Sequence, residues 1–190
     1  MFLKDHKNLD LIINLINSSK LIEAKKELVI LENECFDDFA FYNLIAQICE
    51  KLGEIDEAIK NYIKSLSLNN NFFESKFNLA ILYYKSKNLD QSEELFRQLI
   101  VTNKKDHNLY YNLGIIQFEK KNFSEAIFFL KKALSINSSF FLAYHQLAMI
   151  YEIQGDLSLA INNYQKAVEL DTEGYSLSHN NLGKIGRAHV

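Results

Sequence analysis

A pattern that recurs every 34 residues constrains this chain more than any other feature. Five blocks align without a gap, spanning residues 5–38, 39–72, 73–106, 107–140 and 141–174. The seventh position of each block is Leu or Ile, and the eighth is small in the last four blocks: Ala46, Ala80, Gly114 and Ala148. Such a period is typical of stacked structural units rather than of one closed fold.

Each block is predicted to form a helical hairpin. An apolar-periodic run is followed by a polar break, such as KLGEID or IQGDLS, and then by a second run. The twentieth position is usually small and the twenty-fourth large, as in Ala58 and Tyr62, so the two lie on one helical face. We expect the second helices to begin at residues whose side chains suit an N-cap, which are Asp56, Asp90, Ser124 and Ser158.

Gly114 stands inside a predicted first helix, where glycine costs roughly 1 kcal/mol relative to alanine. Its position is the one that is small in the neighbouring blocks, for example Ala80 and Ala148. We therefore predict that Gly114 lies against its partner helix, where the missing side chain allows a close approach of the backbones.

These residues resemble the tetratricopeptide repeat (TPR) family, whose pattern combines a Leu-Gly or Leu-Ala pair, a Tyr and small residues at these intervals. The best match is AYHQLAMIYEIQGDLSLAINNYQKAVELD, residues 143–171. The resemblance implies an all-α fold, a right-handed superhelical solenoid of antiparallel helix pairs. The chain departs from the family in three respects. It contains no proline, its first block matches weakly, with Asn8 and Ile12 where a large and a small residue are expected, and its fourth block has Gln117 at the usual Tyr position.

A single TPR array is expected over residues 5–184, with a partial sixth repeat at 176–184. The last residues, IGRAHV at 185–190, resemble one reading frame of a common sequencing-library adapter, so we interpret them as a non-native tail. On this interpretation the natural protein continues past Lys184. The array would then lack its terminal cap here, and we expect its C-terminal end to favour self-association.

Composition excludes several classes of partner and compartment. The net charge of −3 arises from 24 acidic and 21 basic residues interspersed along the chain, which disfavours nucleic acid and membrane surfaces as partners. No apolar run approaches the roughly 20 residues of a membrane-spanning helix, and the N-terminus lacks the apolar region of a secretory signal. The 2 cysteines, Cys35 and Cys49, give neither a disulfide framework nor a zinc spacing. We expect a cytoplasmic protein.

The sequence gives little support to catalysis. Its histidines are scattered, and it contains no H-E-x-x-H motif, phosphate loop or nucleophile elbow. We therefore expect a chain that is not an enzyme and that has neither a cofactor nor a metal site.

The second stripe of each first helix, at positions 2, 5, 9 and 12 of a block, faces away from the packing stripe at positions 4, 7, 8 and 11. In TPR proteins the second stripe lines the concave channel. Here it carries aromatic and aliphatic side chains, and we name as groove residues Phe77, Tyr84, Tyr111, Phe118 and His145. Two interpretations are open: the side chains form an exposed partner site, or neighbouring first helices bury them against each other.

Side-chain amides recur next to this stripe, at Asn78, Asn112 and Gln146, and at Asn181 in the partial repeat, while Asn43 lies one position earlier in its own block. An amide both donates and accepts, so spaced amides can satisfy the backbone of an extended peptide. This looks like the asparagine ladder of the TPR array in O-linked N-acetylglucosamine transferase. The alternative is a set of solvated or locally capping asparagines.

The predicted function is a protein-interaction module that binds an extended peptide or a partner helix in its groove. The alternative is the substrate-recognition arm of a larger enzyme, of glycosyltransferase or sulfotransferase type, whose catalytic domain lies elsewhere. The chaperone-binding TPR subclass clamps a carboxylate with Lys, Asn and Arg at positions 5 and 9, whereas here these positions include Phe77, Ile81, Tyr111 and Ile115. A chaperone tail is therefore not the expected ligand, and the identity of the protein or peptide partner stays open.

Overall fold

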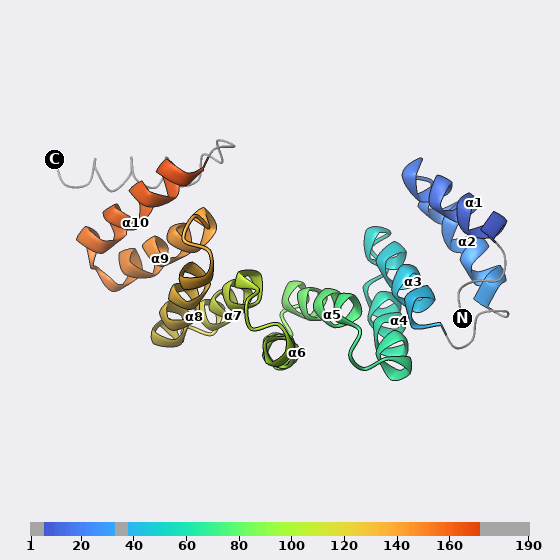
Figure 1. The fold of residues 1–190 in the computed structure, drawn as a ribbon, viewed down its shortest axis with the longest axis horizontal. Coiled ribbons are helices and arrows are strands. Elements are labelled where there is room, and N and C mark those ends of the chain that lie inside the picture. Colours follow the sequence, from blue (N-terminus) through green and yellow to red (C-terminus); the bar gives the residue numbers. More distant parts are fainter. Residues whose placement is uncertain (1–5, 33–37, 172–190) are drawn as a thin grey trace. The chain divides into compact units, whose positions relative to one another are not determined.

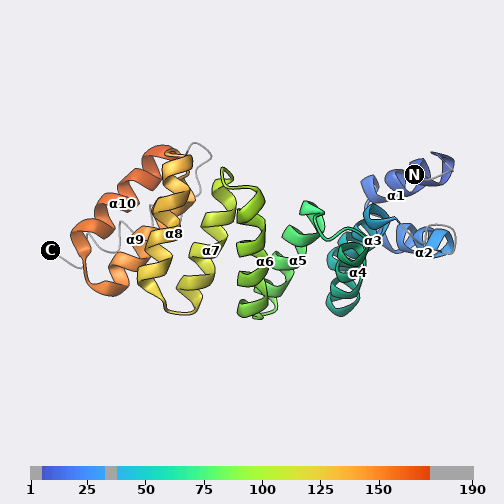
Figure 2. The same cartoon turned by 60° about the horizontal axis from the view of Figure 1, so that its bottom comes forward.

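The computed structural model describes residues 6–32 and 38–171, which form ten α-helices and no strand within these ranges (Figure 1). The helices are α1 (His6–Asn17), α2 (Leu21–Glu32), α3 (Phe39–Lys51), α4 (Ile55–Leu68), α5 (Phe73–Lys85), α6 (Leu89–Thr102), α7 (His107–Glu119), α8 (Phe123–Ile136), α9 (Phe141–Gln154) and α10 (Leu157–Leu170). The prediction of an all-α chain of consecutive helix pairs is confirmed. The second helix packs against its first helix in the pairs α1 and α2, α3 and α4, α7 and α8, and α9 and α10, and Figures 1 and 2 show the last pair side by side.

The 34-residue period sets the helix boundaries. The first helices of the last four pairs begin at Phe39, Phe73, His107 and Phe141, and the second helices at Ile55, Leu89, Phe123 and Leu157. The predicted caps Asp56, Asp90, Ser124 and Ser158 are therefore wrong, because each lies inside the first turn of its helix. A side-chain cap is found one position before the start of α10, where Asp156 accepts a hydrogen bond from the Leu159 N–H at 3.2 Å.

The cap prediction failed because the turn within each pair is closed mainly by the backbone. The residues with positive φ recur every 34 positions, and they are Ser19, Gly53, Lys87, Lys121 and Gly155. Around Gly53, the N–H groups of Gly53 and Glu54 bond to the carbonyls of Glu50 and Cys49 at 3.0 and 2.9 Å. This arrangement is a Schellman motif, which ends the first helix and leads directly into the second.

The chain divides into two compact units, Met1–Leu95 and Phe96–Val190, and each is described by itself. The prediction of one array over 5–184 stays a prediction. Residues 172–190, which include the partial sixth repeat, the proposed tail and the end expected to self-associate, lie outside the described residues.

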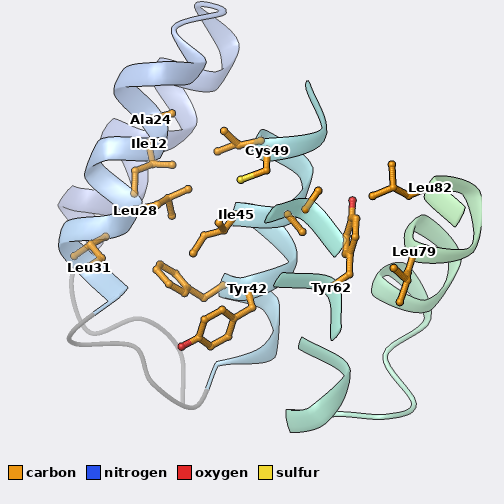
Figure 3. Packing of buried hydrophobic residues seen from close by; sticks show 14 residues of the cluster. Ile12, Ala24, Leu28, Leu31, Tyr42, Ile45, Cys49, Tyr62, Leu79 and Leu82 are labelled. Atoms are coloured by element: carbon orange, nitrogen blue, oxygen red, sulfur yellow. The ribbon is translucent and has the colours of Figure 1, made fainter. Parts of the chain in front are cut away.

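The core of the first unit joins α1 to α5. In Figure 3, Ile12 and Leu28 face Ile45 of α3, while Tyr62 of α4 lies toward Leu79 of α5. All five side chains are buried. In α1, Ile12 is fully buried whereas Leu11, at the position that packs in every later pair, is 44% exposed. The first pair therefore packs through Ile12.

In the second unit, Gly114 marks the close approach of α7 and α8. A Cβ atom at this residue would lie 2.8 Å from Cγ of Leu130 and 3.4 Å from the carbonyl oxygen of Ala126. The prediction that packing explains this glycine is confirmed, because the side chain of Leu130 fills the space above its Cα.

Candidate functional site

Burial distinguishes the centre of the predicted packing stripe, positions 7 and 8, from the second stripe, whereas Tyr83, Tyr144 and Tyr151 at positions 4 and 11 of the packing stripe are half-buried. At the seventh and eighth positions of α3, α5, α7 and α9 every side chain is buried, from Ile45 and Ala46 to Leu147 and Ala148. The second stripe is half-buried or exposed apart from one residue, Asn43. We call this second stripe the accessible stripe; it comprises Ala40, Asn43, Gln47 and Glu50 of α3, Glu74, Phe77, Ile81 and Tyr84 of α5, Asn108, Tyr111, Ile115 and Phe118 of α7, and Leu142, His145, Met149 and Glu152 of α9.

Asn43 belongs to a buried polar chain that links three helices. Its Oδ1 lies 3.0 Å from Oγ of Ser75 on α5, and Oγ of Ser75 lies 2.7 Å from Oγ of Ser65 on α4. Oγ of Ser65 in turn lies 2.7 Å from the carbonyl oxygen of Phe39. Asn43 is only 9% exposed, and both serines are fully buried.

Counting protons fixes the orientation of the Asn43 amide. The three contacts of the polar chain need three protons, but the hydroxyls of Ser65 and Ser75 supply two, and the carbonyl of Phe39 only accepts. Turning the amide so that Nδ2 faces Ser75 provides the third proton and satisfies every contact. Asn43 therefore acts in the junction between two helix pairs.

The other predicted amides have different environments. Asn78 is half-buried, and its side chain hydrogen-bonds to Tyr62, which opposes the effect of burial on the Tyr62 pKa. Asn112 is half-buried, and its Nδ2 donates to the carbonyl of Asn108 at 2.8 Å. Gln146 is 7% exposed, and Asn181 lies outside the described residues.

The predicted aromatic residues are half-buried, and each contacts another ring or a cation. In the first unit, Phe77 stacks on Phe73 with centroids 5.7 Å apart, and Nζ of Lys87 lies 5.9 Å from the ring of Tyr84. In the second unit, Tyr111 meets Phe140 edge to face at 5.0 Å. There Phe118 lies 6.0 Å from Phe123.

His145 lies beside a buried tyrosine on the accessible stripe of α9. Its ring centroid is 5.6 Å from that of Tyr164, at an interplanar angle of 62°. Burial lowers the pKa of His145 and so favours the neutral imidazole. The hydroxyl of Tyr164 donates to Oε2 of Glu152 at 2.8 Å.

The first unit repeats this tyrosine and glutamate pair. The hydroxyl of Tyr62 donates to Oε2 of Glu50 at 3.3 Å, and Nζ of Lys85 lies 2.7 Å from Oε1 of the same carboxylate. Burial and the negative charge of Glu50 raise the pKa of Tyr62.

Sequence reasoning missed the role of these glutamates, although the sequence contains a signal. Where the twenty-fourth position is Tyr, as in Tyr62 and Tyr164, the twelfth is Glu. Where the twenty-fourth position is Phe96 or Leu130, the twelfth is aromatic. A buried hydroxyl needs an acceptor, whereas a buried hydrocarbon does not.

The site contains little reactive chemistry. Burial raises the pKa of the Cys49 thiol to about 11, which disfavours the thiolate that a nucleophile requires. In the part of the chain that the structure describes, no three ligating side chains of His, Cys, Asp or Glu come together to hold a metal ion. None of the helices there has the length and apolarity needed to cross a membrane.

Family models match three segments of the chain. Residues 46–87 match a model described as TPR repeat, and residues 107–140 and 142–173 each match a model described as tetratricopeptide repeat. Among curated proteins none matches the sequence.

Several solved structures share the fold at low sequence identity. A tetratricopeptide repeat protein from Parabacteroides merdae is 15% identical, with a TM-score of 0.85 over 94% of this chain and 71% of that protein. A chain of MamA from Desulfovibrio magneticus RS-1 that runs from residue 41 to the end is 17% identical, with a TM-score of 0.81 over 89% of this chain and 96% of that chain. At these identities the likeness shows the fold alone.

Proposed function

This chain belongs to the tetratricopeptide repeat family, and we propose that it is a noncatalytic interaction module that binds an extended peptide or a partner helix along the accessible stripe. The burial pattern of the first helices carries the proposal. Positions 7 and 8 are buried throughout α3, α5, α7 and α9, whereas the large side chains of the accessible stripe keep part of their surface open to solvent. Half-exposed aromatic residues on a rigid surface are typical of protein interfaces.

The proposed contact residues fall into two groups. The half-buried side chains would contact the partner directly, and they are Phe77, Asn78, Tyr84, Tyr111, Asn112, Phe118 and His145. Asn43 and Gln146 are buried, so in this proposal they support the surface from beneath. Asn181 stays a proposed contact of the partial repeat.

The amide of Asn112 shows how the backbone of a peptide would be bound. Its Nδ2 donates to Asn108 of the same helix, which fixes the orientation of the side chain. Its Oδ1 is then oriented to accept a peptide N–H, and the hydroxyl or ring of Tyr111 would contact the adjacent side chain.

Partner capture tests the proposal. We expect the double variant Asn78→Ala, Asn112→Ala to recover less of its partner from a cell extract than the unaltered chain, with an unchanged helical circular dichroism spectrum. Asn163→Ala is the matched control, because Asn163 also donates Nδ2 to the carbonyl four residues earlier at 2.8 Å but lies on the second helix α10. Equal capture by the double variant and the control would refute the role of the amides.

Tyr111→Ala tests the aromatic part of the surface separately. Reduced capture by a folded variant would support the proposal, whereas loss of folding would assign Tyr111 to the core.

The alternative function, the recognition arm of a larger enzyme, would use the same surface. A transferase sequence downstream in the gene would favour this alternative. A reducing cytoplasm remains part of the proposal, because Cys49 is a buried free thiol.

A further inference from the structure

Charge is segregated between the helices of the second unit. Helices α7 and α9 contain neither Lys nor Arg, and apart from histidine their charged residues are Glu119 and Glu152. The lysines that the structure describes in this unit lie in turns or on second helices, and exposed examples are Lys121, Lys131, Lys132 and Lys166. The side of the unit that carries Tyr111, Phe118 and Met149 is therefore acidic as well as apolar.

The carboxylate of Glu152 is oriented by the core. Tyr164, which is fully buried, donates its hydroxyl to Oε2 at 2.8 Å, while the side chain of Glu152 is exposed. Within the described ranges no Lys or Arg forms an ion pair with Glu152. One hydrogen bond thus orients the carboxylate of an exposed side chain.

The first unit shows what such a carboxylate binds. Glu50 occupies the equivalent position, accepts a hydrogen bond from Tyr62, and has the ammonium of Lys85 at 2.7 Å from its Oε1. The same pair of a buried tyrosine and a glutamate at the surface therefore already holds a lysine in this molecule. The tyrosine and glutamate pair is repeated at Glu152. Lys85 lies on α5, the first helix of the next pair, and the residues that follow α10 lie outside the described residues.

The neighbouring side chains suit the rest of a long basic residue. The stems of Lys and Arg pack along apolar surface while their charged groups reach for a carboxylate. Tyr111, Phe118 and Met149 offer that surface, and an aromatic ring adds attraction for a cation. An acidic peptide would instead bring its charge toward Glu119 and Glu152.

We propose that the side of the second unit formed by α7 and α9 selects extended peptide segments that carry Lys or Arg, and that Glu152 binds the cation. The inference rests on the proposed function, and it adds the chemical class of the partner. It excludes acidic tails, which the charges of these two helices would repel.

A library of short random peptides, displayed on a cellulose support and probed with the full chain, tests the charge preference. We expect the bound sequences to be enriched in Lys and Arg.

Fluorescence anisotropy then compares two peptides: the strongest binder, and the same peptide with every Lys and Arg replaced by Gln. Glu152→Gln is expected to weaken the basic peptide about two- to fivefold, the effect of one exposed charge pair, and to leave the affinity of the uncharged version unchanged. The amide that this substitution introduces still accepts a hydrogen bond from Tyr164, so the fold is retained.

Glu169→Gln is the matched control. It removes the same charge from α10, where Glu169 pairs with Lys166 on the second helix, and it should leave peptide affinity unchanged. Equal weakening by both variants would overturn the role of Glu152. Binders without a basic preference would overturn the charge inference while retaining the proposed function, whereas a library in which no peptide binds the parent chain would count against both.

Arg187 of the same chain is the rival occupant, because it follows Glu152 at the spacing that separates Lys85 from Glu50. If Arg187 binds the carboxylate of Glu152 in the unaltered chain, Glu152→Gln will weaken peptide binding only when Arg187→Ala is also present. That result would overturn the assignment to a separate partner. Dependence on Glu152 in the unaltered chain supports it.

Discussion

The hydroxyl of Tyr164 donates a hydrogen bond of 2.8 Å to Oε2 of Glu152, which lies on the preceding helix. The pair joins the buried face of α10 to the accessible stripe of α9, so a core residue orients a surface residue. We expect Tyr164→Phe to lower the free energy of unfolding by about 1 kcal/mol, the net value of one hydrogen bond. Urea denaturation of Tyr164→Phe, Glu152→Ala and the double variant measures the coupling directly. Additive losses would show that the hydrogen bond contributes nothing to stability.

Lys121 adopts a left-handed conformation, with φ of 63°, at a turn position where two other repeats have glycine. A side chain in this conformation costs roughly 1–2 kcal/mol, while glycine costs some backbone entropy on folding. We therefore expect Lys121→Gly to raise the free energy of unfolding by about 0.5–1 kcal/mol. Gly53→Ala should do the opposite, since φ there is 78° and no neighbouring atom lies within 4 Å of the added Cβ. Thermal unfolding of both variants checks the sign, and two shifts in the same direction would contradict the explanation.

Gly114→Ala places a methyl group 2.8 Å from Cγ of Leu130. Alanine gains about 1 kcal/mol of helix propensity, but overpacking typically costs about 1–3 kcal/mol. We expect a net loss of about 1 kcal/mol in the free energy of unfolding. Leu130→Ala in the same chain should relieve the overlap, so that the second substitution costs less in Gly114→Ala than in the parent. An identical cost in both backgrounds would show that the two residues do not compete for space.

Ser75→Ala breaks the buried polar chain between Asn43 and Ser65. Buried groups that lose a partner cost about 1–3 kcal/mol, and we expect a destabilisation in this range. Ser67→Ala is the control: its hydroxyl bonds to the carbonyl of Lys64 at 2.7 Å but is exposed, so its loss should change little. Hydrogen exchange at the Asn43 side-chain amide tests the proposed orientation, because an Nδ2 that donates to Ser75 should exchange slowly. Fast exchange would favour the opposite orientation.

Burial of His145 predicts a pH dependence of stability. The pKa of His145 is lowered in the folded state from the ordinary value of 6.5, so near and below that pH the unfolded chain binds more protons at this residue. The stabilisation is complete above pH 6.5 and is lost as the pH falls. We expect the unfolding free energy to decline less with acid in His145→Gln than in the parent. An equal decline with acid in His145→Gln and in the parent would contradict the assignment.

The helical hairpins were predictable because their signal is local and repeated. Five copies of a small residue four positions before a large one, with a polar break between two apolar runs, leave few alternatives to stacked helix pairs. The helix starts were less predictable. Asp56 and Ser158 have the side chains of N-caps, but the backbone bonds of the preceding turn begin the helix earlier.

The candidate site was harder to predict for a different reason. Asn43 shares its position with Phe77 and Tyr111, so the period treats the three as equivalent. Its burial depends on Ser65 and Ser75, which come from two other helices, and no periodic pattern contains that information. The pairing of Tyr164 with Glu152 was present in the sequence as a correlation between two positions.

The recurring Schellman turns mean that every hairpin closes through bonds between residues at most five positions apart, as from Glu54 to Cys49 or from Asp156 to Tyr151. A gene duplication or deletion that adds or removes one whole pair would therefore leave the remaining bends intact. Lengthening the protein in evolution, or shortening it by protein engineering, needs a new junction between neighbouring pairs and no new way of turning the chain.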